Sequence, residues 1–142
     1  MKISLNWLKD YIKFNLSAKE LSHRLTLSGL EVEKEEAIGD DTVFELEITP
    51  NRPDCLSFLG IARELSAILG KSVKKPVVKK IKFPKNICAI TIEDKKDCAR
   101  YIGAVLKNVK VAKAPAEIRT NISSLGIRSI NNVVDITNFC LM

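Results

Sequence analysis

The sequence predicts an α+β protein: a small helix-rich α+β N-terminal domain followed by the start of a second, mixed α/β domain. The first observation is the stretch 44–70, where an alternating strand, a proline corner and an amphipathic helix follow one another. The second is the segment 71–86, which holds seven lysines, two prolines and no acidic residue, a composition typical of a linker. The predicted boundaries are 1–70, 71–86 and 87–142.

Two helices are predicted first. Ser4 is placed to cap a helix in which Leu5, Leu8 and Ile12 share one face. The second helix begins with a capping box of Ser17 and Glu20. Its inward-facing residues are predicted to be Leu21, Leu25 and, as a further candidate, Leu27. Gly29 is predicted to end it in the left-handed conformation.

An extended hairpin follows, with Gly39 and Asp40 in its turn. Its second strand alternates, so that Phe44, Leu46 and Ile48 face the core while the glutamates between them face solvent. The first 70 residues are therefore predicted as helix, helix, hairpin, corner and helix.

The corner is stiff because proline fixes φ at residues 50 and 53, and Asp54 is predicted to cap the helix that ends at Gly70. Two interpretations remain open for this corner. It either sets the crossing of the helix over the sheet, or it presents Asn51 and Arg52 to a partner subunit or a phosphate.

The net charge is unevenly distributed. Residues 1–70 carry 8 Lys/Arg and 12 Asp/Glu, whereas residues 71–142 carry 15 and 5, which gives net charges of −4 and +10. The lysine run is either a solvated linker or a sequence-independent RNA contact through Lys74, Lys75, Lys79 and Lys80. Phe83 is its one aromatic residue, so base stacking along the run has little support.

Beyond the lysine run, residues 87–92 and 101–109 are predicted to form paired strands. Pro115 is predicted at the first position of a helix that buries Ile118, Ile122 and Leu125. The last segment, INNVVDITNFCLM, is apolar, and its sequence offers neither a C-cap nor a partner for its apolar face. The second domain is therefore expected to be truncated.

Self-contained catalytic chemistry is not visible in the sequence. It contains no Gly-rich phosphate loop and no metalloprotease or serine-hydrolase motif. The four cysteines lack C-x-x-C spacing and the single histidine lies far from them, so neither a metal site nor a disulfide is expected. No export signal or membrane-length apolar run is present. A cytoplasmic location without membrane contact is expected.

Five blocks nevertheless stand in a recognisable order: MKISLNWLKDYI, LSGLEVE, FELEITPNRPDCLSFLGIARE, ARYIGAVLKNVKV and GIRSINNVVDITNF. Together they closely resemble the start of the β subunit of bacterial-type phenylalanyl-tRNA synthetase. The resemblance implies a B1-like first domain and the opening part of a B3/B4-like editing domain. It also implies an α2β2 enzyme that joins phenylalanine to tRNA(Phe) with ATP and magnesium at a site in the α subunit.

The resemblance has two departures. The family's OB-fold tRNA-binding insert is missing, because only residues 34–41 separate the second block from the following strand. The chain also stops before the histidine-containing part of the editing domain. By resemblance, Thr137 and Asn138 match positions that line the editing pocket, and Asn131, Asn132 and Asp135 belong to the same block. Thr137 and Asn138 could equally serve helix capping and local backbone bonding.

No catalytic residue, metal or cofactor is therefore expected in this chain, which should be inactive alone. The sequence leaves three roles open. The chain is a part of the ligase β subunit, a free-standing RNA-binding or trans-editing module, or a structural interaction domain derived from that subunit.

Overall fold

The computed structural model describes residues 1–82 and 88–142, which divide into two compact units. One unit comprises Met1–Pro76 together with Val111–Met142, and the other comprises Val77–Lys110. The chain combines helices with one small antiparallel sheet, so the predicted α+β class is confirmed. Among the described helices, none is long and apolar enough to cross a bilayer. The boundaries predicted at residues 70 and 86 stay predictions, and positions 83–86 of the lysine run lie outside the described residues.

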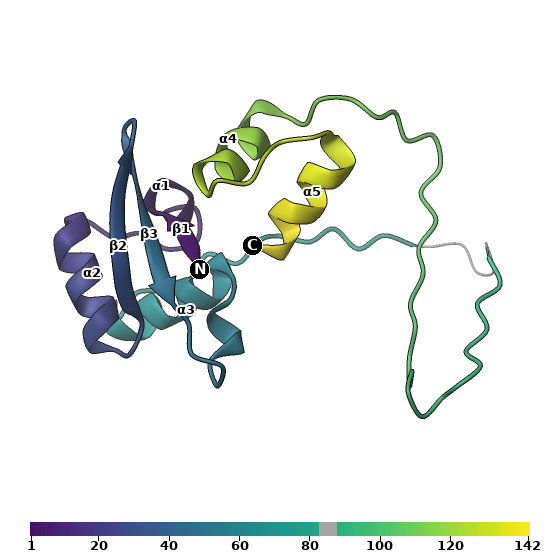
Figure 1. Cartoon of the computed structure of the whole chain (residues 1–142), viewed down its shortest axis with the longest axis horizontal. Helices are drawn as coiled ribbons and strands as arrows, with labels where there is room; N and C mark the ends of the chain where they lie inside the picture. Colours follow the sequence, from purple (N-terminus) through teal and green to yellow (C-terminus); the bar gives the residue numbers. More distant parts are fainter. Residues whose placement is uncertain (83–87) are drawn as a thin grey trace. The chain divides into compact units, whose positions relative to one another are not determined.

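The sheet has three antiparallel strands in the order β1-β3-β2: β1 (Lys2–Ser4), β2 (Glu31–Ile38) and β3 (Asp41–Glu47). Figure 1 shows β2 and β3 as a long hairpin with α2 (Ala18–Leu27) alongside β2. The hairpin turns at Gly39, whose φ of 62° suits glycine. β1 was not predicted, because three residues are too short to show alternation. It pairs with the middle of β3, where Ile3 faces Phe44.

Local capping chemistry explains where the first helices begin. Ser4 accepts a hydrogen bond from the Trp7 amide at 3.0 Å, as predicted, but α1 (Leu5–Leu8) is a single turn that ends before Ile12. The predicted capping box of α2 is confirmed, since the Ser17 and Glu20 side chains each bond the other's backbone N–H. The prediction that Leu27 also faces the core is wrong. It is 74% exposed, because it lies two positions after the buried Leu25 and so on the opposite face.

The helix after the corner, α3 (Phe58–Leu69), is capped by Ser57. The prediction that Asp54 caps this helix is therefore wrong. Ser57 Oγ accepts from the Gly60 amide at 3.1 Å. Asp54 belongs instead to a short 3-10 helix, Pro53–Cys55, which the two-proline corner starts. This 3-10 turn presses the Asp54 carbonyl so close to α3 that a Cβ on Gly60 would lie 1.8 Å from it. The predicted end of α3 is confirmed, because Gly70 has φ 62°.

One hydrophobic core joins the sheet, α1, α2 and α3. Its fully buried large side chains include Ile3, Leu8, Ile12, Leu21, Leu25, Leu30, Phe44, Leu46, Phe58, Ile61 and Leu65. The burial of these apolar side chains, which contributes about 25 cal/mol per Å² of apolar surface removed from water, is the main force that holds these short elements together.

The C-terminal part of this unit forms a helix pair, α4 (Ala116–Ser124) and α5 (Asn132–Leu141). Pro115 is the N-cap of α4, so the helix begins one residue later than predicted, at Ala116. The apolar face of α5 has a partner, contrary to expectation. Phe139 stacks on Trp7 with ring centroids 4.9 Å apart, and the Phe58 amide donates to the Met142 carbonyl. The pattern of one helix cannot reveal a partner so distant in the chain.

The strands predicted at residues 87–92 and 101–109 are wrong for the residues that the structure describes. Residues 88–92 and 101–109 have no regular secondary structure and are mostly exposed, while Ile87 lies outside the described residues. A two-stranded hairpin is marginal in water unless a further layer buries one of its faces. Between these two segments the chain forms a turn, in which Asp94 Oδ1 accepts from the Lys96 amide at 2.8 Å.

Candidate functional site

The proline corner gathers the charged groups with the most distinctive geometry in the described part of the chain. Arg52 donates to both carboxylate oxygens of Asp54, each at 3.0 Å, and to Glu64 Oε2 on α3 at 2.7 Å. The same guanidinium nitrogen lies 3.0 Å from Cys55 Sγ. Arg52 is therefore half buried and is held within the corner by groups of the same chain. Asn51 is exposed.

The surroundings lower the pKa of Asp54 and raise the pKa of Cys55. The hydrogen bonds from Arg52 lower the pKa of Asp54 to about 2, so this carboxylate is charged at neutral pH. Burial, followed by the bond to Asp54, raises the pKa of Cys55 to about 11. The thiol is thus protonated at pH 7 and is a poor nucleophile and metal ligand.

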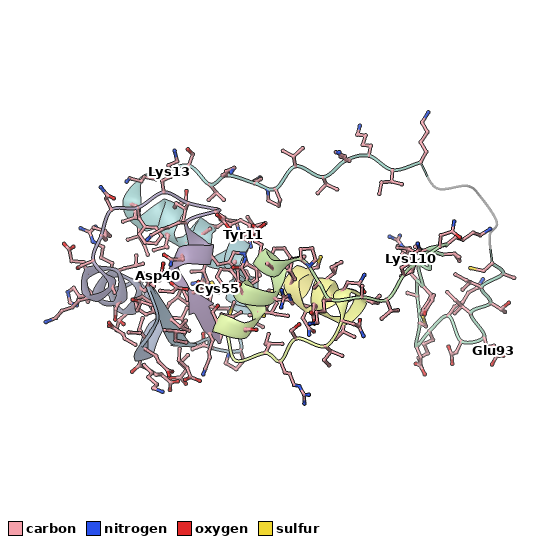
Figure 2. The ribbon with its side chains drawn as sticks, turned by 90° about the horizontal axis from the view of Figure 1, so that it is seen from above. Tyr11, Lys13, Asp40, Cys55, Glu93 and Lys110 are labelled. Carbon is pink, nitrogen blue, oxygen red and sulfur yellow. The ribbon has the colours of Figure 1, made fainter. Side chains whose placement is uncertain are left out.

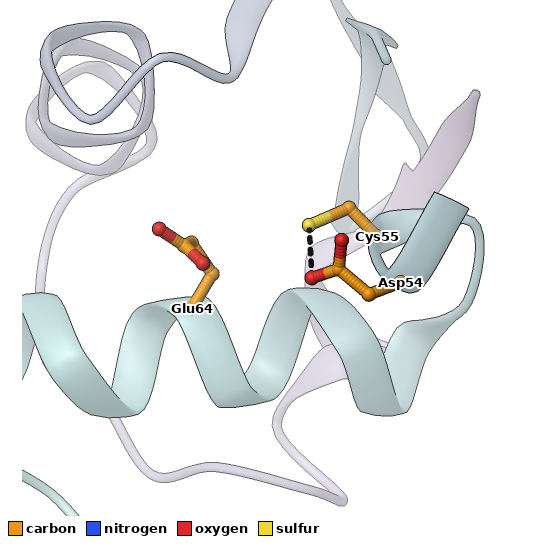
Figure 3. Close-up of side chains that lie close together, drawn as sticks. All are labelled: Asp54, Cys55 and Glu64. Carbon is orange, nitrogen blue, oxygen red and sulfur yellow. Dashed lines mark hydrogen bonds between the residues drawn. The ribbon is translucent and has the colours of Figure 1, made fainter. Parts of the chain in front are cut away.

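Asp54, Cys55 and Glu64 also satisfy the spacing of a metal site, since their ligand atoms all lie within 4.8 Å of one another (Figure 3). Glu64 projects from α3, and the Cys55 thiol donates to Asp54 at 3.4 Å. The cation that these groups bind is the Arg52 guanidinium, which contacts all three. A metal ion would have to displace Arg52 and deprotonate Cys55, so the cluster is best explained as the bond between the corner and α3.

The residues predicted for an editing pocket lie at the start of α5. Asn131 is the N-cap, and its side-chain oxygen accepts from the amides of Val133 and Val134 at 3.0 and 3.1 Å. Asn132 bonds Ala112 twice, through its backbone N–H and its side-chain oxygen, at 2.7 and 3.0 Å. These two asparagines therefore fix how the chain enters the helix.

Asp135 is completely buried, although it carries a charge. Its carboxylate accepts from Ser129 Oγ at 2.6 Å and from the Ile130 amide at 2.9 Å, and these bonds, the one from Ser129 first, hold its pKa below the usual value. Thr137 is exposed and donates to the Val134 carbonyl at 2.7 Å, while Asn138 is half buried. Asp135 is thus a positioning group, and Thr137 and Asn138 lie nearer the surface of the same helix.

The four lysines that are candidates for RNA contact are all exposed and lie outside regular secondary structure. Lys74 is tied to the first unit, because its amide donates to the Tyr11 carbonyl at 2.7 Å, and Lys75 follows it directly. Lys79 and Lys80 belong to the second unit. Lys9 and Lys13 line the same cleft as Lys74. The sequence did not indicate this grouping, because these two lysines belong to a segment near the N-terminus.

Comparison with known proteins first defines a class of domain and then particular relatives. Residues 97–142 match the B3/4 domain family. The phenylalanine–tRNA ligase beta subunit of Rhodopirellula baltica is 38% identical over 145 residues, which cover 100% of this chain and 21% of that protein. The same subunit of Fusobacterium nucleatum is 49% identical over 105 residues, covering 72% and 13%. In Thermotoga maritima the subunit is 40% identical over 109 residues, again 72% and 13%.

The resemblance predicted from the five sequence blocks is therefore confirmed: this chain is a relative of the beta subunit of phenylalanine–tRNA ligase. The chain spans about a fifth or less of the length of these relatives.

Proposed function

We propose that this chain acts as part of a phenylalanine–tRNA ligase β subunit. In this role it supports the ATP-dependent joining of phenylalanine to tRNA(Phe) by an α subunit, within an α2β2 assembly in the cytoplasm. The observation that carries the proposal is that the similarity to the Rhodopirellula baltica subunit extends over the entire chain.

The chain itself is proposed to supply no catalytic group for aminoacylation. ATP and magnesium would bind the α subunit. The one cluster of three potential metal ligands in the described residues supports this division, because the Arg52 guanidinium already binds both of its carboxylates and its thiol is protonated at neutral pH.

The start of α5 is proposed to form one wall of an editing pocket. Asn131, Asn132 and Asp135 would hold its backbone in place through the bonds described above. Thr137 and Asn138 would then be the side chains that face an aminoacyl ester or a water molecule. A pocket of this kind can select a tyrosine hydroxyl, because a buried polar group that is left unpaired costs on the order of 1–3 kcal/mol.

Co-purification tests the proposed role directly. The chain is expressed with a phenylalanine–tRNA ligase α subunit encoded in the same genome, and a stable complex on gel filtration is expected. A monomeric chain that ignores the α subunit but binds RNA would instead favour the free-standing module.

The exposed side chain of Asn51 provides a variant that maps the contact. If the proline corner meets the α subunit, Asn51→Ala should weaken the complex, while the exposed Asn15→Ala serves as the matched control. Equal behaviour of the two variants would remove the corner from the interface.

A further inference from the structure

A basic cleft of about 720 Å³ opens between residues 9–13, which follow α1, and residues 70–74, which leave α3. Its size falls within the range of small-molecule sites, roughly 300–1,000 Å³. Four lysines line it, Lys9, Lys13, Lys71 and Lys74, together with a single carboxylate, Asp10. Two of the lining residues, Tyr11 and Lys13, are labelled in Figure 2.

The backbone on both sides of the cleft is anchored. Gly70 takes the left-handed conformation that turns the chain off α3, and Ser66 Oγ then donates to the Lys71 carbonyl at 2.5 Å. Further along, the Lys74 amide donates to the Tyr11 carbonyl at 2.7 Å. Ile12 is buried and Val73 packs against the core. The lysines therefore project from fixed backbone.

The charge of this cleft contrasts with that of its surroundings. Residues 1–70 carry a net charge of −4, whereas the residues that line the cleft include four lysines and one carboxylate, a net charge of +3. Lys9 is partly engaged, since its ammonium lies 3.3 Å from Asn6 Oδ1 and 5.8 Å from the centre of the Phe14 ring. Lys13, Lys71 and Lys74 take part in none of the salt bridges found in the described residues.

We propose that this cleft binds the phosphodiester backbone of RNA, with Lys13, Lys71 and Lys74 as the phosphate ligands. The inference rests on the proposed tRNA partner and adds the place and chemistry of the contact. Lysine ammonium groups neutralise phosphates as point charges and do not read bases, so binding is expected to be independent of sequence.

Two observations favour RNA over an acidic peptide. Tyr11 lines the cleft and is only half buried, which leaves part of an aromatic ring available to a base. The positive charge also continues along the chain at Lys75, as a polymer with regularly spaced charges would require.

The first test compares two triple variants of the full chain. Lys13→Gln, Lys71→Gln and Lys74→Gln together remove the three phosphate ligands. Lys19→Gln, Lys95→Gln and Lys96→Gln remove the same charge from exposed lysines elsewhere. Binding to tRNA(Phe) transcript and to an unrelated single-stranded RNA is measured over a range of salt concentrations. The cleft variant should flatten the slope of log K against log salt by about 2, at roughly 0.7 per phosphate, for both RNAs. An equal change in the two variants overturns the proposal.

The second test uses the unmodified chain, so that it does not depend on the folding of a variant. Acetylation of each lysine is followed by mass spectrometry with and without RNA, and protection at Lys13 and Lys71 but not at Lys19 is expected. Uniform protection, or the same protection pattern with poly-glutamate at equal charge, would assign the cleft to anions in general and overturn RNA as its ligand. Co-purification of the cleft variant with the α subunit is the separate readout. If the cleft variant still co-purifies with the α subunit and its RNA binding is unchanged, the cleft is not the RNA site, while the proposed function is unaffected.

Discussion

Arg52 connects the proline corner to α3 through one guanidinium group. Exposed ion pairs contribute about 0–1 kcal/mol, whereas a two-pronged Arg–carboxylate pair with a second acid is more specific in geometry. Here the bond to Asp54 is two-pronged and Glu64 lies on the next helix. A network of this kind explains why the corner keeps its direction.

The Asp54 carboxylate should make stability depend on acidity. Its pKa is lowered from 3.8 to about 2 in the folded chain, so the stabilisation is present above pH 4 and is lost as the pH falls from about 4 to 2. In Asp54→Asn this part of the acid sensitivity should disappear, as followed by melting temperature between pH 5 and 2. Asp40→Asn, at an exposed turn, is the control, and a wild-type-like loss in Asp54→Asn would contradict the assignment.

Gly60 is required for space and not for backbone freedom. A Cβ there would meet the Asp54 carbonyl at 1.8 Å, so Gly60→Ala should cost at least about 2 kcal/mol of unfolding free energy in urea. Gly39→Ala is the instructive comparison, since Gly39 has φ 62° but nothing within 4 Å of a Cβ. Its cost should be about 1 kcal/mol, from left-handed strain alone. The reverse order would show that the corner moves away from α3 without penalty.

At the scale of elements, α5 packs through aromatic stacking. The Trp7 ring contacts the rings of both Phe58 and Phe139, with centroid distances of 3.9 and 4.9 Å. Trp7 is also the only tryptophan of the chain, so its fluorescence reports on this contact.

Phe139→Ala should therefore shift the Trp7 emission to longer wavelength and destabilise the chain by about 1–2 kcal/mol, less than for a fully buried Phe because Phe139 is half exposed. Leu141→Ala is the control, since Leu141 lies on the same helix and is 74% exposed. An unchanged emission spectrum in Phe139→Ala would show that α5 does not rest on Trp7 in solution.

At the scale of the whole molecule, backbone protection should direct proteolysis. Trypsin should cut first after the exposed Lys79, Lys80 and Lys82, and only later after Lys71 and Lys74, where the bond from Lys74 to Tyr11 holds the chain. Mass spectrometry of the first fragments tests this order. Initial cleavage inside residues 56–69 would contradict the fold of α3.

Catalysis should be absent from the purified chain. It should neither exchange pyrophosphate in the presence of phenylalanine and ATP nor deacylate tyrosyl-tRNA, because the activating site is proposed to lie in the α subunit. Addition of the α subunit provides the comparison within the same assay. Pyrophosphate exchange by the chain alone would overturn the proposed division of labour.

The sequence by itself determined the features that depend on neighbouring residues. The Ser4 cap, the Ser17–Glu20 capping box and the left-handed glycines at 29 and 70 were predictable, because each involves atoms within about four positions of one another. The α+β class and the five family blocks were predictable for a related reason, as they follow from the order of residues along the chain. Asp54 was mistaken for a cap because it occurs at a suitable spacing, but its carboxylate pairs with Arg52, and Ser57 caps α3 instead.

Only the tertiary structure decided which distant segments meet. Three features join segments that are distant in the sequence: the pairing of β1 with β3, the stacking of Phe139 on Trp7, and the cleft between residues 9–13 and 70–74. No local sequence pattern indicates that these segments meet. Hydrophobic periodicity shows that a face must be buried, but it does not name the surface that buries it. The lysines of the cleft were visible as residues from the start. Their convergence on one site follows from the turn at Gly70 and the bond between Lys74 and Tyr11.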